Sequence, residues 1–207
     1  MICLTRTCMQ YRPGAVLVGV LLLGGCAIQP GVPETQSDSE PAPQRDEIIV
    51  VENDVQQDFD NALALLRQEQ YQAAIPVLDR VVASEQRLTA PYINLAIAHR
   101  RSGDDKKAVE NHDKALAIEP FNPVANNEKG LLLRTKGKFD EARAAYSKAL
   151  EKNPEYLPGI RNLGILCDIY LRDWDCALQQ FERYQELSPD DKQVGIWISD
   201  LKRRTGG

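Results

Sequence analysis

The side chains best suited to chemistry are few and widely spaced along the 207 residues. They are five cysteines and two histidines: Cys3, Cys8, Cys26, His99, His112, Cys167 and Cys176. A zinc site needs four ligands in a compact arrangement, and no Cys/His set in the sequence has a spacing typical of one. No Gly-rich phosphate loop and no serine, cysteine or carboxylate pair indicates nucleophilic or acid–base catalysis. The sequence therefore predicts a protein that is not an enzyme and has no metal or other cofactor.

The charge of the chain narrows the class of partner. Its 25 lysines and arginines are outnumbered by 30 aspartates and glutamates, which gives a formal net charge of −5 at pH 7. Phosphate backbones require a basic surface, so we expect no nucleic-acid partner. Nothing in the composition indicates a small-molecule substrate either, which leaves a protein or peptide as the expected partner.

The N-terminal segment has the pattern of a targeting signal. Arg12 precedes an apolar run, 15–23, that is too short to span a bilayer as a mature helix. The run ends in Leu-Gly-Gly-Cys at residues 23–26, which resembles a bacterial lipobox. That resemblance implies that residues 1–25 are a lipoprotein signal peptide, and that Cys26 is acylated, for example with palmitate, after cleavage. The sequence leaves open whether translation starts at Met1 or Met9.

The residue after the lipobox cysteine bears on the expected location. Ala27 resembles the class that is sorted to the outer membrane, so we expect a lipid-anchored protein on the periplasmic side of that membrane. Residues 26–45 hold the lipidated cysteine and a polar, acidic stretch with four prolines. Such a composition buries no core, and it predicts a disordered tether that holds the folded part off the membrane.

A repeat of 34 residues organises most of the remaining chain, within 46–191. Its four copies are 55–88, 89–122, 123–156 and 157–191. Each copy has a small residue at its eighth place: Ala62, Ala96, Gly130 and Gly164. Each also has alanine near its twentieth: Ala74, Ala108, Ala142 and Ala177. A fixed period of this length is typical of stacked repeat proteins, whose usual product is a binding surface.

Each copy predicts two helices joined by a tight turn. Pro91, Pro123 and Pro158 fall in the first three places of their copies, where a helix tolerates proline. Gly103 and Gly137 fall at the fifteenth place, where glycine can adopt the left-handed conformation that ends a helix. The small residues at the eighth and twentieth places allow the two helices to cross closely.

These residues together resemble the tetratricopeptide repeat family over 55–191, with the third copy the best match. The resemblance implies an all-α, right-handed solenoid of helix-turn-helix hairpins. A last helix within 192–207 carries Val194, Trp197, Ile198 and Leu201 on one face, and we expect it to cap the final hairpin. The alternative is that this face makes a structural homodimer.

The two late cysteines are expected to form a disulfide. Cys167 lies late in the first helix of the fourth copy and Cys176 lies at the start of the second, on either side of a turn with one extra residue. Two buried thiols are the alternative. His99 and His112 stand at places that hold aromatic packing residues in the family, so we expect them to pack in the core.

The resemblance also implies where a partner binds, because the first helix of each hairpin lines a concave groove in this family. We call the matching residues the predicted groove. They are Ile93, Asn94, Ile97, Arg100, Arg101, Asn127, Leu131, Arg134, Arg161, Asn162 and Ile165. Amides, guanidinium groups and aliphatic side chains suit an extended or helical segment with acidic and aliphatic residues. The lysine and asparagine set of the family's dicarboxylate clamp is not reproduced.

The expected function is a non-catalytic protein–protein interaction scaffold or adaptor that helps assemble or stabilise an envelope complex. Three resemblances compete for its specific role. They are a pilotin-like assembly factor for the secretin of type IV pili, an adaptor for peptidoglycan hydrolases, and an accessory protein of a TonB-type system.

Overall fold

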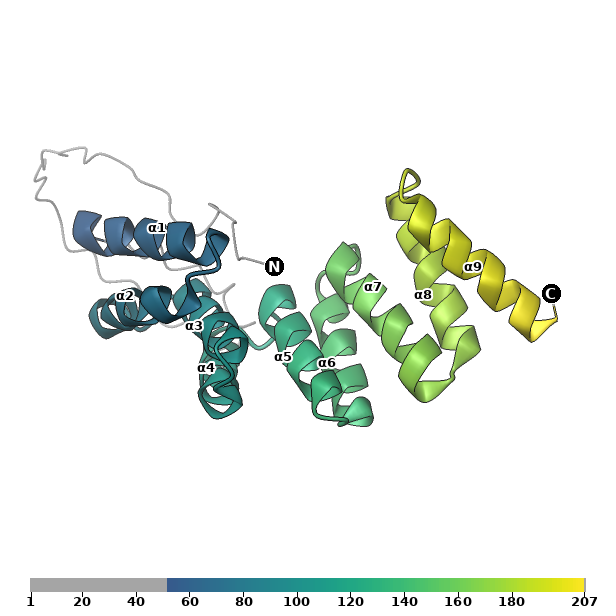
Figure 1. The fold of residues 1–207 in the computed structure, drawn as a ribbon, viewed down its shortest axis with the longest axis horizontal. Helices are drawn as coiled ribbons and strands as arrows, with labels where there is room; N and C mark the ends of the chain where they lie inside the picture. The colour runs from purple at the N-terminus through teal and green to yellow at the C-terminus, as the bar shows by residue number, and fades with distance from the viewer. Residues whose placement is uncertain (1–51, 207) are drawn as a thin grey trace, which may run out of the picture. The chain divides into compact units, whose positions relative to one another are not determined.

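The computed structural model describes residues 52–206, and Figure 1 shows that they form helices joined by short connections. No strand occurs in this range, so the prediction of an all-α fold is confirmed. The predicted signal peptide (1–25), the lipidation site at Cys26 and the predicted tether (26–45) lie outside the described residues.

The helices come in pairs, followed by one single helix. The pairs are α1 (Asn53–Arg67) with α2 (Tyr71–Ser84), α3 (Thr89–Arg101) with α4 (Asp105–Ile118), α5 (Pro123–Thr135) with α6 (Phe139–Glu151), and α7 (Leu157–Ile165), extended by the π-helical segment η2 (Leu166–Leu171), with α8 (Trp174–Leu187). The last helix is α9 (Lys192–Thr205). Each pair occupies one of the four repeat ranges, except that α1 begins two residues earlier.

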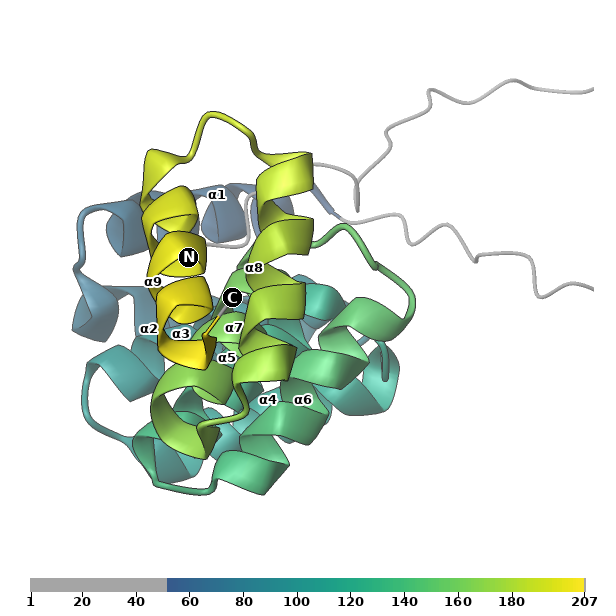
Figure 2. The same cartoon turned by 90° about the vertical axis from the view of Figure 1, so that its right-hand side faces the viewer.

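Packing runs from each helix pair to the next. The two helices of a pair contact each other along their length, and the second helix of a pair contacts the first helix of the following pair. The first helices α3, α5 and α7 also contact one another in turn. Figure 2 looks onto the C-terminal end, where α9 lies beside α8. Val194 and Leu201 of α9 are fully buried there, so this helix covers the last pair.

Four positive φ angles end the first helices of the pairs. Gly103 and Gly137 have φ of 86° and 73°, which confirms the left-handed glycines predicted from the sequence. Glu69 and Arg172 take the same conformation, with φ of 58° and 53°. A side chain in this region costs on the order of 1–2 kcal/mol. The first and last turns are therefore built with local strain that the two glycine turns avoid.

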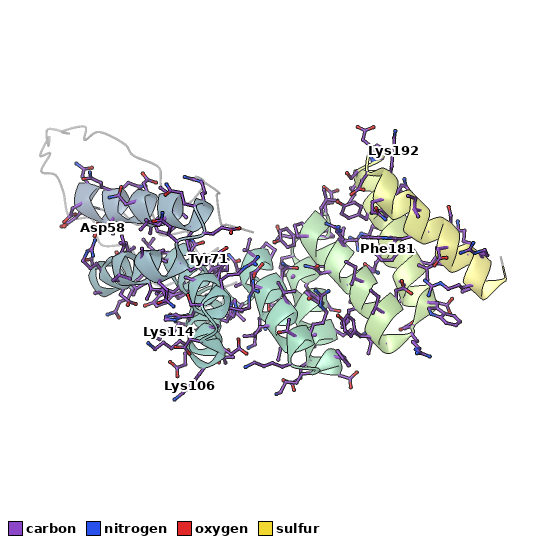
Figure 3. The ribbon with its side chains drawn as sticks, viewed as in Figure 1. Asp58, Tyr71, Lys106, Lys114, Phe181 and Lys192 are labelled. Atoms are coloured by element: carbon purple, nitrogen blue, oxygen red, sulfur yellow. A yellow bond between two sulfur atoms is a disulfide. The ribbon has the colours of Figure 1, made fainter. Side chains whose placement is uncertain are left out.

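Close approach of the paired helices explains the small residues at the eighth place of each repeat. A Cβ atom built on Gly130 would lie 2.6 Å from Cε1 of Tyr146, and one on Gly164 would lie 2.5 Å from Cε1 of Phe181. Phe181 is labelled on α8 in Figure 3. A methyl group does not fit at either distance, so a large ring on the second helix requires glycine on the first.

The extra residue of the fourth repeat is absorbed between α7 and α8. The backbone widens into η2, Arg172 turns left-handed, and the Asp173 N–H donates to the Cys167 carbonyl at 2.9 Å. A disulfide joins Cys167 to Cys176 with a Cα–Cα distance of 5.9 Å. Closing a loop this short removes about 2–3 kcal/mol of chain entropy from the unfolded state on the usual model.

The close contact between glycine and ring makes a quantitative prediction. Gly130→Ala is expected to lower the free energy of unfolding by about 1–3 kcal/mol, because the Tyr146 ring must move. Adding Tyr146→Leu should recover much of that loss, because the first repeat pairs alanine with leucine at these places. Urea unfolding of the two single variants and the double variant measures the coupling between the sites.

Gly137→Ala is the matched control, because its Cβ atom meets nothing within 4 Å and its cost comes from φ alone. Tyr146→Leu should not rescue it. A Gly130→Ala variant whose loss is the same with tyrosine or leucine at residue 146 would contradict the packing explanation.

Candidate functional site

The residues of the predicted groove lie on α3, α5 and α7, the first helices of the last three pairs. Their exposure varies along the chain. The buried members are Ile93, Asn94, Ile97 and Asn127; the partly exposed members are Arg100, Leu131, Arg134, Asn162 and Ile165; the exposed members are Arg101 and Arg161. The accessible part of this surface is therefore rich in arginine. That it binds a partner stays a prediction.

Two side-chain bonds join the three helices across this surface. The Asn162 Nδ2 group on α7 donates to Oδ1 of Asn127 on α5 at 2.8 Å. Arg100 on α3 donates through Nη2 to Oε2 of Glu128 on α5 at 2.9 Å. Polar residues on this face thus fix one repeat to the next, in addition to whatever they offer a ligand.

The ion pair between Arg100 and Glu128 is largely shielded from water. The side chain of Arg100 is 14% exposed and that of Glu128 is 2% exposed. Removing one member of such a pair leaves the other charge buried, which costs about 3–5 kcal/mol in comparable proteins. Glu128 was not among the predicted site residues, although it stands directly after Asn127 on the same face.

A polar cluster surrounds this ion pair, and we define it as Arg100, Glu128, Arg134 and Tyr146. Tyr146 comes from α6 and is fully buried, yet its hydroxyl has no hydrogen-bond partner. The Nε of Arg100 and the Nη1 of Arg134 are buried without a partner as well. Buried polar atoms are normally paired, and besides this cluster the unpaired ones between residues 52 and 206 belong to Asn94, Ser102, His112 and Gln180.

The electrostatics of Tyr146 place it among these charges. The pKa of the Tyr146 hydroxyl is raised to about 12, mainly by desolvation; the charges of Arg134 and Arg100 oppose the rise and that of Glu128 adds to it. Tyr170 of η2 closes the cluster on one side: the Arg134 guanidinium lies 5.7 Å from the centre of its ring. Neither tyrosine belongs to the predicted groove.

Both histidines are in the interior, but they differ in surroundings. His112 is fully buried, neither ring nitrogen has a hydrogen-bond partner, and desolvation together with the charges of Arg100 and Lys129 lowers its pKa to about 4. His99 is 5% exposed, and desolvation followed by the charge of Lys107 lowers its pKa. Its Nδ1 lies 3.9 Å from a carboxylate oxygen of Asp104.

One group of potential metal ligands occurs in the part of the chain that the structure describes. It consists of Cys167, Asp173 and Cys176, whose ligand atoms lie within 4.8 Å of one another. The disulfide uses both sulfurs. The Asp173 carboxylate accepts from the Cys176 N–H at 3.1 Å and pairs with Arg143 at 3.0 Å. Asp173 therefore caps the N-terminus of α8, and the disulfide joins that end of the helix to Cys167 of η2.

The predicted membrane anchor is the lipid on Cys26, which lies outside the described residues. Of the helices between residues 52 and 206, none has the length and apolar character needed to cross a bilayer.

Comparison with known proteins agrees with the repeat pattern. Residues 59–123 and 123–156 each match the tetratricopeptide repeat family, so the chain contains tetratricopeptide repeats over this range. The photosystem I assembly protein Ycf3 of Prochlorococcus marinus (strain MIT 9211) is 26% identical over 130 residues, which make up 61% of this chain and 73% of that protein.

Two further similarities differ in extent. The protein O-mannosyl-transferase TMTC1 of Mus musculus is 28% identical over 138 residues, or 65% of this chain, but these make up 14% of the transferase. The solved structure of PilF from Pseudomonas aeruginosa superposes with a TM-score of 0.67 at 21% identity, covering 73% of this chain and 68% of that one. The second similarity shows a shared solenoid fold.

The low pKa of His112 predicts a loss of stability in acid. The unfolded chain binds a proton at this histidine once the pH falls below about 6.5, whereas the folded chain does so near 4, so stability is lost between these values. From pH 7 to pH 4.5 the loss from this one group is about 2–3 kcal/mol. His112→Leu, which copies Leu78 of the first repeat, should remove that part of the loss.

Urea unfolding of the natural chain and His112→Leu at both pH values is the measurement. His99 and every carboxylate are retained in the variant, so the difference between the two curves isolates His112. Equal acid losses in both proteins would mean that His112 is not held neutral by burial.

Proposed function

We propose that this tetratricopeptide-repeat chain is a non-catalytic adaptor that binds a protein segment on the predicted groove and helps assemble or stabilise an envelope complex. In this proposal Cys26 carries the lipid that anchors the protein in the outer membrane, on the periplasmic side. The proposal has two parts, partner binding and anchoring, and they are tested separately.

The observation that carries the binding part is the surface formed by α3, α5 and α7. Arg101 and Arg161 are exposed on this surface, and the Arg161 guanidinium also lies 5.4 Å from the centre of the Trp197 ring of α9. The partly exposed Leu131 and Ile165 add aliphatic contact beside them. Guanidinium groups beside aliphatic patches suit a segment with acidic and apolar side chains.

The non-catalytic part of the proposal is supported by the chemistry of the described residues. Both histidines are buried with depressed pKa values, and the two cysteines between residues 52 and 206 are joined to each other. The likeness to a mannosyl-transferase extends over a minor part of that enzyme and rests on the repeats. The name of Ycf3 describes an assembly protein, which fits an adaptor role.

The anchoring part rests on the Leu-Gly-Gly-Cys pattern at residues 23–26 and on Ala27. The proposed complex is one of the three envelope systems named above: secretin assembly, peptidoglycan hydrolysis or TonB-type energy transduction. The structural similarity to PilF is a similarity of fold and favours none of them by itself. A homodimer through α9 is the alternative use of this chain.

The binding part predicts that a double charge reversal on the groove abolishes partner capture. The natural chain and an Arg101→Glu/Arg161→Glu variant are crosslinked in native envelopes, and the captured proteins are identified and then titrated in purified form. We expect at least a tenfold loss of affinity in the variant, because two exposed cations that face the acidic segment become anions.

The matched control is Lys106→Glu/Lys192→Glu, which makes the same charge change at exposed sites on α4 and α9 (Figure 3). It should bind as the natural chain does. Equal capture by both variants would move the binding surface away from the groove, and capture only of further copies of the chain would favour the homodimer.

The anchoring part predicts that Cys26→Ser shifts the protein from the membrane pellet to the soluble fraction when the same envelopes are fractionated. Retention of the variant in the pellet would refute the lipid anchor.

A further inference from the structure

An open cleft lies between the second helices α6 and α8, outside the predicted groove. Its volume is about 610 Å³, which falls within the range of about 300–1,000 Å³ that is usual for ligand sites. Leu150 of α6 and Leu163 of α7 supply an apolar lining and are themselves buried, with exposures of 9% and 6%. No residue of the predicted groove lines the cleft, so it is a separate candidate site.

Two small residues on α6 leave the cleft open. Ala144 and Ser147 line it and are exposed on that helix. The second repeat has Glu110 and Asp113 at the same two places, the twenty-second and the twenty-fifth. The third repeat thus presents two short side chains where the second presents two carboxylates. An approaching chain therefore meets the apolar lining without having to displace long or charged side chains.

A buried amide lines the cleft with one end unpaired. Gln180 of α8 is 7% exposed, and its Oε1 has no hydrogen-bond partner. Its Nε2 donates to Oε1 of Gln179 at 3.3 Å. Turning the amide over would leave an N–H group unpaired instead of an oxygen, so one end lacks a partner in either orientation. Other buried polar atoms between residues 52 and 206 are unpaired too, but Gln180 is the residue that combines one with a place in this cleft.

The charged groups that line the cleft are mainly positive. Lys148 of α6 and Arg183 of α8 face two carboxylate-free sides of it, and Glu151 is the one acid in the lining. In the described part of the chain neither cation forms an ion pair. The Nζ of Lys148 lies 5.4 Å from the centre of the Phe121 ring, and Nη2 of Arg183 donates to the Pro154 carbonyl at 2.6 Å. Two cations against one anion leave one net positive charge, which favours an acidic group.

We infer that this cleft docks a second partner segment, one that carries an Asp or Glu beside an aliphatic side chain. The aliphatic side chain packs on Leu150 and Leu163, where apolar surface is otherwise left facing an open cleft. The carboxylate pairs with Lys148 or Arg183. The main chain of the segment offers both N–H and C=O groups, so it pairs with the free end of the Gln180 amide in either orientation.

A site on the second helices gives the chain two separate binding faces. The predicted groove is formed by α3, α5 and α7, whereas the cleft is lined mainly by α6 and α8. A chain that holds one segment on each face joins two partners, which a single binding surface does not do. The inference therefore goes beyond the proposed function, and it does not depend on what the predicted groove binds.

Phage display of a random twelve-residue peptide library tests the inference on the full-length chain in a mild detergent. Peptides are selected on the natural chain and depleted on Ser147→Trp, in which an indole fills the cleft from an exposed position. We expect the enriched peptides to carry Asp or Glu within three residues of Leu, Ile or Val. Failure to enrich any peptide that discriminates between the two chains would overturn the inference, and so would enriched peptides without an acidic residue.

Calorimetric titration of the enriched peptides then tests the named residues. Gln180→Leu should weaken binding about tenfold, yet it should unfold at the same urea concentration as the natural chain or at a higher one, because it removes a buried amide with an unpaired end. Lys148→Glu should also weaken binding about tenfold, whereas Lys106→Glu, the same charge change at an exposed site on α4, should have no effect. Unchanged affinity in Gln180→Leu would contradict the inference.

The groove variant Arg101→Glu/Arg161→Glu separates the two sites. It should bind the enriched peptides as the natural chain does, because neither arginine lines the cleft. Loss of peptide binding in this variant would assign the peptides to the groove and overturn the inference. Normal peptide binding by a chain that captures no envelope partner through its groove would refute the proposed groove while supporting the cleft.

Discussion

The fold depends on how closely the two helices of each pair approach. Where a large aromatic ring stands on the second helix, the first helix must present bare backbone, as Gly130 does to Tyr146 and Gly164 does to Phe181. Where the second helix carries Leu78 or His112, alanine is tolerated on the first, at Ala62 and Ala96. The distance between paired helices is thereby set by complementary sizes, and the spacing of successive pairs follows from it.

This constraint also decides where polar residues can be placed. Between residues 52 and 206 most buried polar side chains lie on the first helices α3 and α5, whereas Asn111, His112 and Gln180 lie on second helices. Two side-chain bonds on this surface, Asn127 with Asn162 and Arg100 with Glu128, join one repeat to the next.

The sequence predicts the repeated features well and the singular ones poorly. The 34-residue period, the helix-starting prolines and Gly103 and Gly137 together specify an all-α stack, because each is a local signal that recurs in register. The left-handed Glu69 and Arg172 carry no such signal, since neither residue type favours that conformation. The π-helical form of η2 is likewise a response to one inserted residue, and it depends on how α7 and α8 pack.

The candidate site shows the same division. Family resemblance supplies the places on the first helices, but it does not say which side chains become buried or which pair with each other. Glu128 lies outside the predicted groove, and its partner Arg100 lies one repeat away, on α3, so no local pattern in the sequence indicates the pair. The Tyr146 ring is buried in the core, and this residue lies outside the predicted groove. The pKa of its hydroxyl depends on charges contributed by α3 and α5.

Helix contacts that run mainly from each pair to the next have a consequence for how such a chain can change over evolutionary time. A tandem duplication of residues 123–156 would create one new junction, of the same kind as those already present on either side. The chain could therefore grow by whole units without redesigning any interior, and point substitutions on the first helices could then vary the surface independently. The length of the surface on the first helices would be set by gene duplication, and the selectivity of that surface by single residues.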